Sequence, residues 1–137
     1  MNGYKTVAEV PTRFRDTDAI GHVNNAVYLS YLEVARMEYM RQVCGISNFN
    51  GVDFILGRVE IDYRAPVMPG ETLLVGIRVS RFGGASFDFE YRLEDKATGR
   101  LMAQAKTVQV AFDYKANKVK RVTEEFRNLA GRHDGLS

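Results

Sequence analysis

Hydrophobic and polar residues follow two different periods along this chain, and the change of period divides it into elements. Near the N-terminus the residues alternate, with Tyr4, Thr6, Ala8, Val10 and Phe14 on one side and Lys5, Glu9 and Arg13 on the other. A period of two predicts a half-exposed strand over residues 4–14. Because Pro11 has no backbone N–H to donate, we expect this strand to lie at a sheet edge or to bulge there.

After a polar turn over residues 15–25 the period changes to 3.6, which predicts one long helix of about five turns. Its apolar face comprises Val27, Tyr28, Tyr31, Leu32, Val34, Ala35, Tyr39 and Val43, and its opposite face comprises Ser30, Glu33, Arg36, Met37 and Arg41. Asn24 or Asn25 can cap the helix, because an Asn side-chain oxygen accepts an unpaired N–H of the first turn. Gly45 favours the conformation that ends a helix.

The rest of the chain alternates with a period of two and predicts further strands. They cover residues 53–64, 72–81, 87–93 and 101–113, and a short amphipathic helix follows over residues 123–129. In the first of them Ile55, Val59, Ile61 and Tyr63 share one face, and Arg58, Glu60, Asp62 and Arg64 share the other. Short connections favour antiparallel pairing, and the long helix must bury its apolar face on the sheet. The pattern predicts an α+β fold in a single domain, residues 1–137.

Composition and charge exclude several classes of protein. The 137 residues are 45% hydrophobic and 26% charged, the balance of a globular protein. A net charge of +2, evenly scattered, is too small for a nucleic-acid binder. No segment approaches the ~20 apolar residues of a membrane span, and the first ten residues lack the apolar run of a signal peptide. Cys44 is the only cysteine, so we expect a buried thiol and a cytoplasmic protein.

Reactive side chains concentrate between Arg15 and Asn25, in the loop that leads into the long helix. A helix start presents unpaired N–H groups and the positive pole of the helix dipole. A carboxylate beside N–H groups that polarise a carbonyl is the minimum equipment for hydrolysing an activated acyl group. The same residues also fit turn and capping chemistry, so the local pattern leaves both interpretations open. Asp16, Asp18 and His22 form too small a ligand set, and we expect no metal.

The segment from Asp18 to Arg36 contains Asp-Ala-Ile-Gly-His-Val-Asn-Asn and then Tyr-Leu-Ser-Tyr-Leu-Glu-Val-Ala-Arg. This pattern resembles the signature of the 4-hydroxybenzoyl-CoA thioesterase branch of the hot-dog superfamily. The likeness continues through Val59–Pro66 and the pair Gly70-Glu71, so it covers nearly the whole chain. The resemblance implies a hot-dog fold, with a five-stranded antiparallel sheet in the order 1-3-4-5-2 wrapped around the long helix. It also implies homodimers in which the second strands pair, and a reaction that uses no metal and no redox cofactor.

The resemblance also implies roles for individual residues. Asp18 matches the catalytic carboxylate, which acts as a nucleophile or as a general base. The backbone N–H of Asn25 matches the group that polarises the thioester carbonyl. Substrate contacts would come from Gly21, His22, Val23, Tyr28 and Tyr31, with Ile61 and Tyr63 from the second strand. His22 departs from the benzoyl-specific members, which usually have an apolar residue there, and Asp16 is expected to be structural.

The expected coenzyme A site departs from the family's pattern. The family often places Arg or Lys at the turn between the third and fourth strands, but here that turn is Phe82–Ala85 and only Arg81 is close. Arg58 and Arg64 are the other candidates. The resemblance therefore implies an acyl-CoA thioesterase, a homodimer or a tetramer of two dimers, and leaves acyl-carrier-protein thioesters open. A module that binds an acyl thioester without cleaving it is the alternative.

Overall fold

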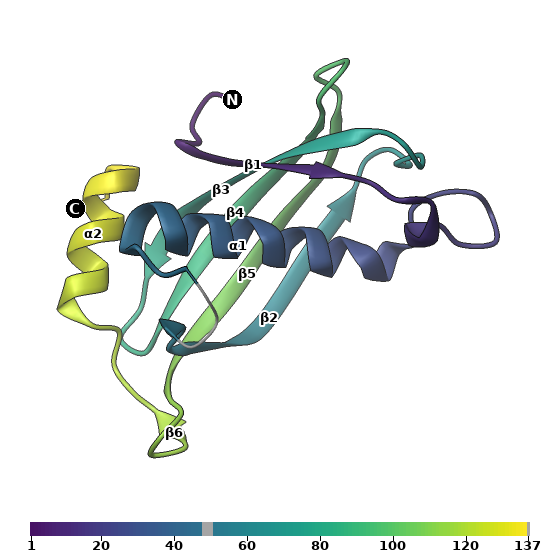
Figure 1. The fold of residues 1–137 in the computed structure, drawn as a ribbon. Coiled ribbons are helices and arrows are strands. Elements are labelled where there is room, and N and C mark those ends of the chain that lie inside the picture. The colour runs from purple at the N-terminus through teal and green to yellow at the C-terminus, as the bar shows by residue number, and fades with distance from the viewer. Residues whose placement is uncertain (48–50, 137) are drawn as a thin grey trace.

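The computed structural model describes residues 1–47 and 51–136, and shows one curled antiparallel sheet with a long helix across its concave face (Figure 1). The strands are β1 (Thr6–Pro11), β2 (Phe54–Tyr63), β3 (Thr72–Phe82), β4 (Ser86–Asp95), β5 (Leu101–Asp113) and β6 (Lys118–Val119), and the helices are α1 (Tyr28–Cys44) and α2 (Glu124–Asp134). The sheet order is β1-β3-β4-β5-β2, with β6 paired to β5. The α+β hot-dog fold and its strand order are confirmed.

The start and end of α1 follow the predicted caps. The Asn24 side chain accepts the N–H of Ala26 at 2.9 Å, which begins a 3-10 turn, Asn25–Val27, that continues into the helix. Gly45 ends the helix with a φ of 71°, in the left-handed region that glycine adopts without strain. Of the two candidate asparagines, Asn24 is therefore the cap, and Asn25 is the first residue of the turn.

Two positions on α1 were assigned to the wrong face. Val34 is 47% exposed, whereas Arg36 is only 9% exposed and donates a hydrogen bond from Nη1 to the Tyr91 hydroxyl at 3.2 Å. A long side chain buries its aliphatic stem wherever its charged head finds a polar partner. Polarity along the sequence cannot show such a partner, which here comes from β4.

The first strand is shorter than predicted because the backbone turns away after Pro11. The Thr12 hydroxyl donates to the carbonyl of Glu71 at 2.6 Å, and the Arg13 N–H then bonds to the Asp16 carboxylate at 3.0 Å. These contacts start a 3-10 turn, Phe14–Asp16, which leaves Phe14 85% exposed rather than on the inner face of the strand. As Pro11 predicted, β1 is an edge strand and pairs with β3.

The other edge strand, β2, contains a bulge. Its register to β5 shifts between Leu56 and Arg58, so Gly57 is an extra residue. An inserted residue reverses the alternation of side chains on either side of it. The prediction that Ile55 shares a face with Val59 was therefore wrong. The inner face comprises Phe54, Leu56, Val59, Ile61 and Tyr63.

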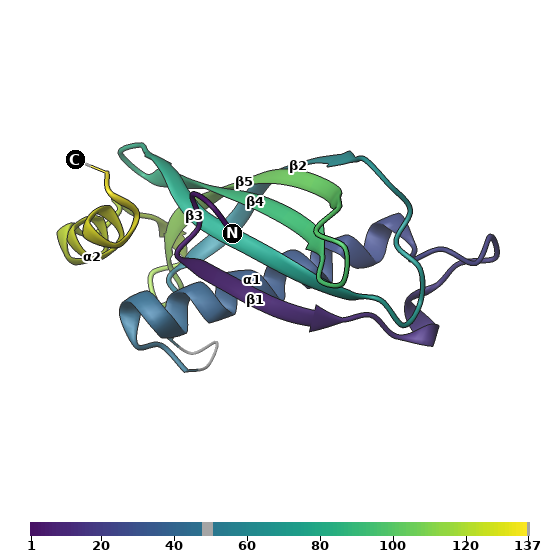
Figure 2. The ribbon, with the colours of Figure 1, turned by 90° about the horizontal axis from the view of Figure 1, so that it is seen from above.

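Helix α2 lies at one end of the sheet (Figure 2) and is longer than predicted. It begins after Thr123, whose side chain accepts the N–H of Phe126. His133 Nε2 and Thr6 Oγ1 are 2.9 Å apart, and the Asp134 carboxylate accepts the Tyr39 hydroxyl at 2.6 Å and the Val79 N–H at 2.9 Å. The helix is thereby connected to β1, α1 and β3. No helix that the structure describes is long and apolar enough to cross a membrane.

Candidate active site

The loop between β1 and α1 is organised around the buried carboxylate of Asp16, which is 3% exposed. This carboxylate accepts the Arg13 N–H at 3.0 Å, the Arg13 guanidinium at 3.0 Å and the Tyr31 hydroxyl at 2.8 Å. Burial by itself raises the pKa of Asp16, but the hydrogen bonds outweigh it and hold that pKa below its ordinary value. With all these donors bound, the Asp16 carboxylate fixes the loop and is not available to a substrate.

The neighbouring Asp18 sits in a tight turn with one oxygen free. Its N–H donates to the carbonyl of His22 at 2.9 Å, and its Oδ1 accepts the Ile20 N–H at 2.9 Å. Gly21 has a φ of 89°, a backbone conformation that other residues adopt only with strain. Within the part of the chain that the structure describes, no protein group donates to Asp18 Oδ2. That oxygen is left for a ligand.

This turn, the start of α1 and the end of β2 enclose a cavity of about 320 Å³. Its lining comprises Asp18, Ile20, His22, Val23, Asn25, Tyr28, Tyr63, Arg64, Ala65 and Pro66. The Val23 N–H donates to the carbonyl of Val67 at 2.8 Å, and the Tyr63 hydroxyl donates to the carbonyl of Asn25 at 3.1 Å. These two bonds join the loop and the helix start to the segment that ends β2.

The helix start contributes a polarising group to the cavity. The Ala26 N–H is already bonded to the Asn24 side chain, but the Asn25 N–H has no acceptor among residues 1–47 and 51–136. Such N–H groups carry the positive end of the helix dipole. The cavity is therefore lined by a residue with an unpaired carboxylate oxygen and by one with an unpaired backbone N–H, as far as the described residues go. This pair can activate a nucleophile and stabilise an oxyanion.

Aromatic rings form one wall of the cavity. The rings of Tyr28 and Tyr63 meet edge to face, with centroids 4.9 Å apart, and Tyr28 is 2% exposed. Burial raises the pKa of Tyr28, which keeps its hydroxyl neutral. Tyr31 does not line the cavity. The centroid of its ring lies 5.9 Å from that of Tyr28. Burial, and secondly the hydrogen bond to Asp16, raise the pKa of Tyr31. Tyr31 therefore stabilises the loop through Asp16 instead of contacting the cavity.

The remaining expected site residues are distributed unevenly. Gly21 shapes the Asp18 turn, and Ile61 lies one inner-face position before Tyr63, outside the cavity lining. Of the three arginines considered for coenzyme A, only Arg64 lines the cavity. Arg58 forms an ion pair with Glu60, and Arg81 forms one with the buried Asp88.

Three lining residues were missed in the sequence. Ile20 is 77% exposed, and the available signal in the sequence was a large apolar residue two positions after Asp18 in an otherwise polar loop. Ala65 and Pro66 follow Arg64, just beyond the end of β2, and belong to the stretch Val59–Pro66 that resembles the family, but they were assigned no role at the site. The hydrogen bond of Tyr63 to Asn25 joins this segment to the loop.

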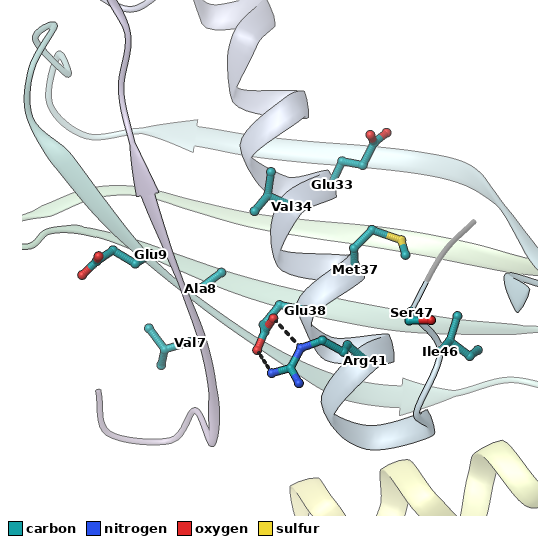
Figure 3. A pocket seen from close by; sticks show the side chains of 10 residues that line it. All are labelled: Val7, Ala8, Glu9, Glu33, Val34, Met37, Glu38, Arg41, Ile46 and Ser47. Atoms are coloured by element: carbon teal, nitrogen blue, oxygen red, sulfur yellow. Dashed lines mark hydrogen bonds and ion pairs between the residues drawn. The ribbon is translucent and has the colours of Figure 1, made fainter. Parts of the chain in front are cut away.

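A second, larger cavity of about 560 Å³ lies between β1 and the side of α1 (Figure 3). Its lining comprises Val7, Ala8, Glu9, Glu33, Val34, Met37, Glu38, Arg41, Ile46 and Ser47. The hydrogen bond from Arg41 to Glu38 lowers the pKa of that carboxyl. This cavity has no helix start. In the described residues, no group of three or more His, Cys, Asp or Glu side chains is arranged to hold a metal ion.

Known proteins share both the sequence pattern and the fold. The family model of the thioesterase-like superfamily matches residues 12–129. The chain belongs to this superfamily. This thioesterase-like chain is 35% identical to "Acyl-CoA thioesterase YbgC" of Haemophilus influenzae, over 72% of the chain and 73% of that protein. It is 25% identical to "Long-chain acyl-CoA thioesterase FadM" of Escherichia coli, over 87% and 92% of the two chains.

Among solved structures, a Thermus thermophilus thioesterase complexed with coenzyme A and Zn superposes on this thioesterase-like chain with a TM-score of 0.89. The two sequences are 32% identical, and the match covers 98% of each chain. The expected family is therefore confirmed, and the chain is a thioester hydrolase of the hot-dog fold.

Proposed function

We propose that this protein hydrolyses acyl-CoA thioesters to a free acid and coenzyme A, with Asp18 as its catalytic carboxylate. The observation that carries the proposal is that Asp18 and Asn25 line one cavity and that neither Asp18 Oδ2 nor the Asn25 N–H has a protein partner among the described residues. The names of the bacterial relatives support acyl-CoA as the substrate class.

In this mechanism the thioester carbonyl oxygen accepts the Asn25 N–H, which stabilises the negative charge that develops there. Asp18 then acts in one of two ways. As a nucleophile it attacks the carbonyl carbon and expels the coenzyme A thiolate, leaving a mixed anhydride that water hydrolyses. As a general base it removes a proton from water, which attacks the carbonyl carbon directly. Both routes end with the free acid and the protonated thiol.

The cavity lining suggests how the substrate is held. Val23, Tyr28 and Tyr63 offer apolar surface for the acyl group, with Ile61 two residues before Tyr63 on β2. His22 also lines the cavity, and its carbonyl accepts the Asp18 N–H. Arg64 supplies a cation for the coenzyme A phosphates. The assay described below determines which acyl group the cavity prefers.

A homodimer fits the exposed edge of the sheet. In the described residues β2 pairs only with β5, and its inner face carries Leu56 at 42% and Tyr63 at 44% exposure. A second copy pairing through β2 would cover this face and bring its own strand beside the cavity. A tetramer and a cytoplasmic location stay predictions. Burial raises the pKa of the Cys44 thiol to about 11, so this cysteine fits a structural role.

The test is thiol release from a panel of acyl-CoAs, from acetyl to palmitoyl together with benzoyl and phenylacetyl. We expect the wild type to turn over at least one of them, and Asp18→Asn to lose at least ~100-fold in kcat, the usual contribution of a base or nucleophile. Glu38→Gln, in the larger cavity, is the matched control and should retain activity. Circular dichroism checks that both variants keep the fold.

Each negative result has a defined meaning. Unchanged turnover in Asp18→Asn would overturn the assignment of the catalytic carboxylate. Silence across the panel, followed by thiol release from acyl-carrier-protein thioesters, would change the substrate class and keep the chemistry. Tight binding of acyl-CoA without release of thiol from either carrier would identify a binding module instead.

A further inference from the structure

The connection between β5 and β6 is a hairpin that projects from the body of the molecule. Figure 1 shows it beyond the ends of the other strands. The carboxylate of Asp113 accepts the N–H groups of Lys115 and Ala116, each at 3.0 Å, and Asn117 has a φ of 54°. A side-chain cap and a positive φ are features of a tight turn. The tip is therefore folded by its own contacts, and residues 114–119 are all exposed.

Positive charge is concentrated on this hairpin. Residues 113–121 have a net charge of +3, from one acid and four bases, whereas the whole chain carries only +2, so all other residues together carry −1. The bases are Lys115, Lys118, Lys120 and Arg121. Among the described residues only Lys120 forms an ion pair, with Asp53 at 2.6 Å, and the other three bases are exposed. The next acids, Glu124 and Glu125, belong to α2, which Figure 1 shows set back from the hairpin tip.

Exposed apolar side chains lie among these bases. Tyr114 is 59% exposed and Val119 is 53% exposed. Val119 lies directly opposite Phe112 in the pairing of β5 with β6, and the ring centroids of Phe112 and Tyr114 are 5.1 Å apart. Because side chains alternate along a strand, Val110 and its β2 partner Ile55 share the face of Phe112. An apolar strip therefore extends from the outer face of β2 to the tip of the hairpin.

This combination fits an anionic lipid surface better than it fits another macromolecule. At the boundary of a bilayer, aromatic and aliphatic side chains insert between the headgroups while long basic side chains reach the phosphates. A nucleic acid would use the bases but would gain nothing from Val119 and Ile55. A second copy docking through the same surface would set a charge of +3 against another of +3, which is unfavourable. Charge therefore selects the lipid.

We propose that the β5–β6 hairpin binds the surface of membranes that contain anionic phospholipids, with Tyr114 and Val119 inserted at the interface and the bases on the headgroups. This binding goes beyond the proposed hydrolysis and does not depend on it. Its consequence for that reaction concerns the substrate. Acyl chains partition into bilayers more strongly with each CH2 group, so a hydrolase held at the surface meets long-chain acyl-CoAs where they accumulate.

The first test is co-sedimentation of the wild type with vesicles, in the absence of acyl-CoA. The vesicles consist of phosphatidylcholine, alone or mixed with an equal part of phosphatidylglycerol. Each base near an anionic surface strengthens binding about fivefold, so a net charge of +3 should give at least a ~100-fold preference for the anionic vesicles. High salt should remove most of this preference, because it screens the charges. Equal binding to both vesicles, or no binding to either, would overturn the proposal.

Matched pairs of variants locate the contact. Lys115→Gln combined with Lys118→Gln removes two unpaired bases and should weaken binding to the anionic vesicles about 25-fold. Lys5→Gln combined with Arg100→Gln removes two exposed bases that lie outside the hairpin and form no ion pair among the described residues, and should leave binding nearly unchanged. An equal loss in both double variants would show that the net charge of the chain, and not the hairpin, attracts it to the vesicles.

Two exposed valines test the apolar part of the contact. Val119→Thr keeps the shape of the side chain but replaces a methyl group by a hydroxyl, and should weaken binding about fourfold, as for one buried CH2 group. Val34→Thr is the control, because Val34 is 47% exposed on α1, and it should bind as the wild type does.

The other possible partners give distinct results. Binding to duplex DNA without binding to vesicles, or self-association in sedimentation that Val119→Thr abolishes, would overturn the proposal. Thiol release separates this proposal from the proposed function: an active enzyme that ignores vesicles refutes only the lipid contact, and an inactive protein that binds anionic vesicles refutes only the reaction.

Discussion

The two cavities on α1 differ in a way that separates space from chemistry. The cavity beside the helix is the larger, about 560 Å³ against about 320 Å³ at the helix start, and it also contains carboxylates. Along the side of the helix, however, Glu38 is already bonded to Arg41. At the helix start, Asp18 Oδ2 and the Asn25 N–H have no protein partners among the described residues. Glu33 also lines the larger cavity and has no partner among the described residues, but no helix start lies beside it. The difference teaches that the candidate site lies where an unpaired carboxylate oxygen and an unpaired backbone N–H belong to the same cavity, not where the cavity is larger.

We expect the largest loss of stability and activity from Asp16→Asn. The substitution removes the charge that holds Arg13 and Tyr31 around the helix-start cavity. We expect the free energy of unfolding to fall by about 1.5–3 kcal/mol, the range for a hydrogen bond to a charged group, and thiol release to fall with it. Urea denaturation at pH 7 measures the first effect. An unchanged unfolding free energy would show that Asp16 does not organise the loop.

The same variant should also change the dependence of stability on pH. The pKa of Asp16 is lower in the folded chain than its ordinary value of 3.8, so the unfolded chain binds the proton more readily. The stabilisation is therefore complete above that ordinary value and is lost as the pH falls through the lowered value. In urea denaturation, the stability difference between the wild type and Asp16→Asn should stay constant from pH 7 down to near 3.8 and shrink only as the pH falls further.

Gly21→Ala should have a smaller effect, through the backbone alone. With a φ of 89° and nothing within 4 Å of an added Cβ, the cost is conformational, about 1–2 kcal/mol. Gly70→Ala is a matched control, because Gly70 has a φ of 90° and equally open surroundings. Both variants should lose similar stability, but only Gly21→Ala should also lose thiol release. Equal thiol release by the two variants would show that the Asp18 turn does not contribute to catalysis.

Tyr63→Phe should have a smaller effect, confined to activity at the helix-start cavity. It keeps the ring but removes the hydrogen bond that joins the end of β2 to Asn25. Loss of about 1 kcal/mol in positioning corresponds to roughly a fivefold fall in kcat/KM. Tyr114→Phe is the control, because it removes a similar bond to the carbonyl of Phe54 at the other end of β2. A fall in activity in both variants would point to a general weakening of the strand.

The smallest effect is expected from Glu38→Gln in the larger cavity. Its pair with Arg41 lies at the surface, where water screens the two charges and leaves the pair little stabilising effect. Stability and thiol release should both remain within measurement error of the wild type. A large loss of activity would indicate that the active site is the larger cavity beside the helix and not the cavity at the helix start.

The helices and strands of this fold can be predicted from local periodicity, but the side of each element on which some residues lie cannot. The change from period two to period 3.6 predicts β1, α1 and the later strands, because burial on one face imposes those periods. The bulge at Gly57 reverses which side chains face inward, and nothing in the alternation marks it. Arg36 was placed on the solvent face because its partner Tyr91 lies 55 residues away.

The candidate site divides in the same way. Asp18, Asn25 and Tyr28 lie within one loop and its helix, so a short motif identifies them together. Tyr31 belongs to the same motif, but its hydroxyl bonds to Asp16 and its ring lies outside the cavity, which only the folded chain shows. Ala65 and Pro66 belong to the stretch Val59–Pro66 that resembles the family, but they were assigned no role at the site, because tertiary contacts bring them to the cavity.

The contacts of α2 have a consequence for how the chain folds during synthesis. The bond between Thr6 and His133 joins residues 127 positions apart, and Asp134 completes the contacts of Tyr39 and of Val79 in β3. On the ribosome, β1 can therefore pair only after β3 has been synthesised, and α1 can complete its contacts only after α2 has been synthesised. Pairings so distant in sequence slow folding and prolong the exposure of apolar surface. A nascent chain stopped before α2 should be a strong substrate for chaperones.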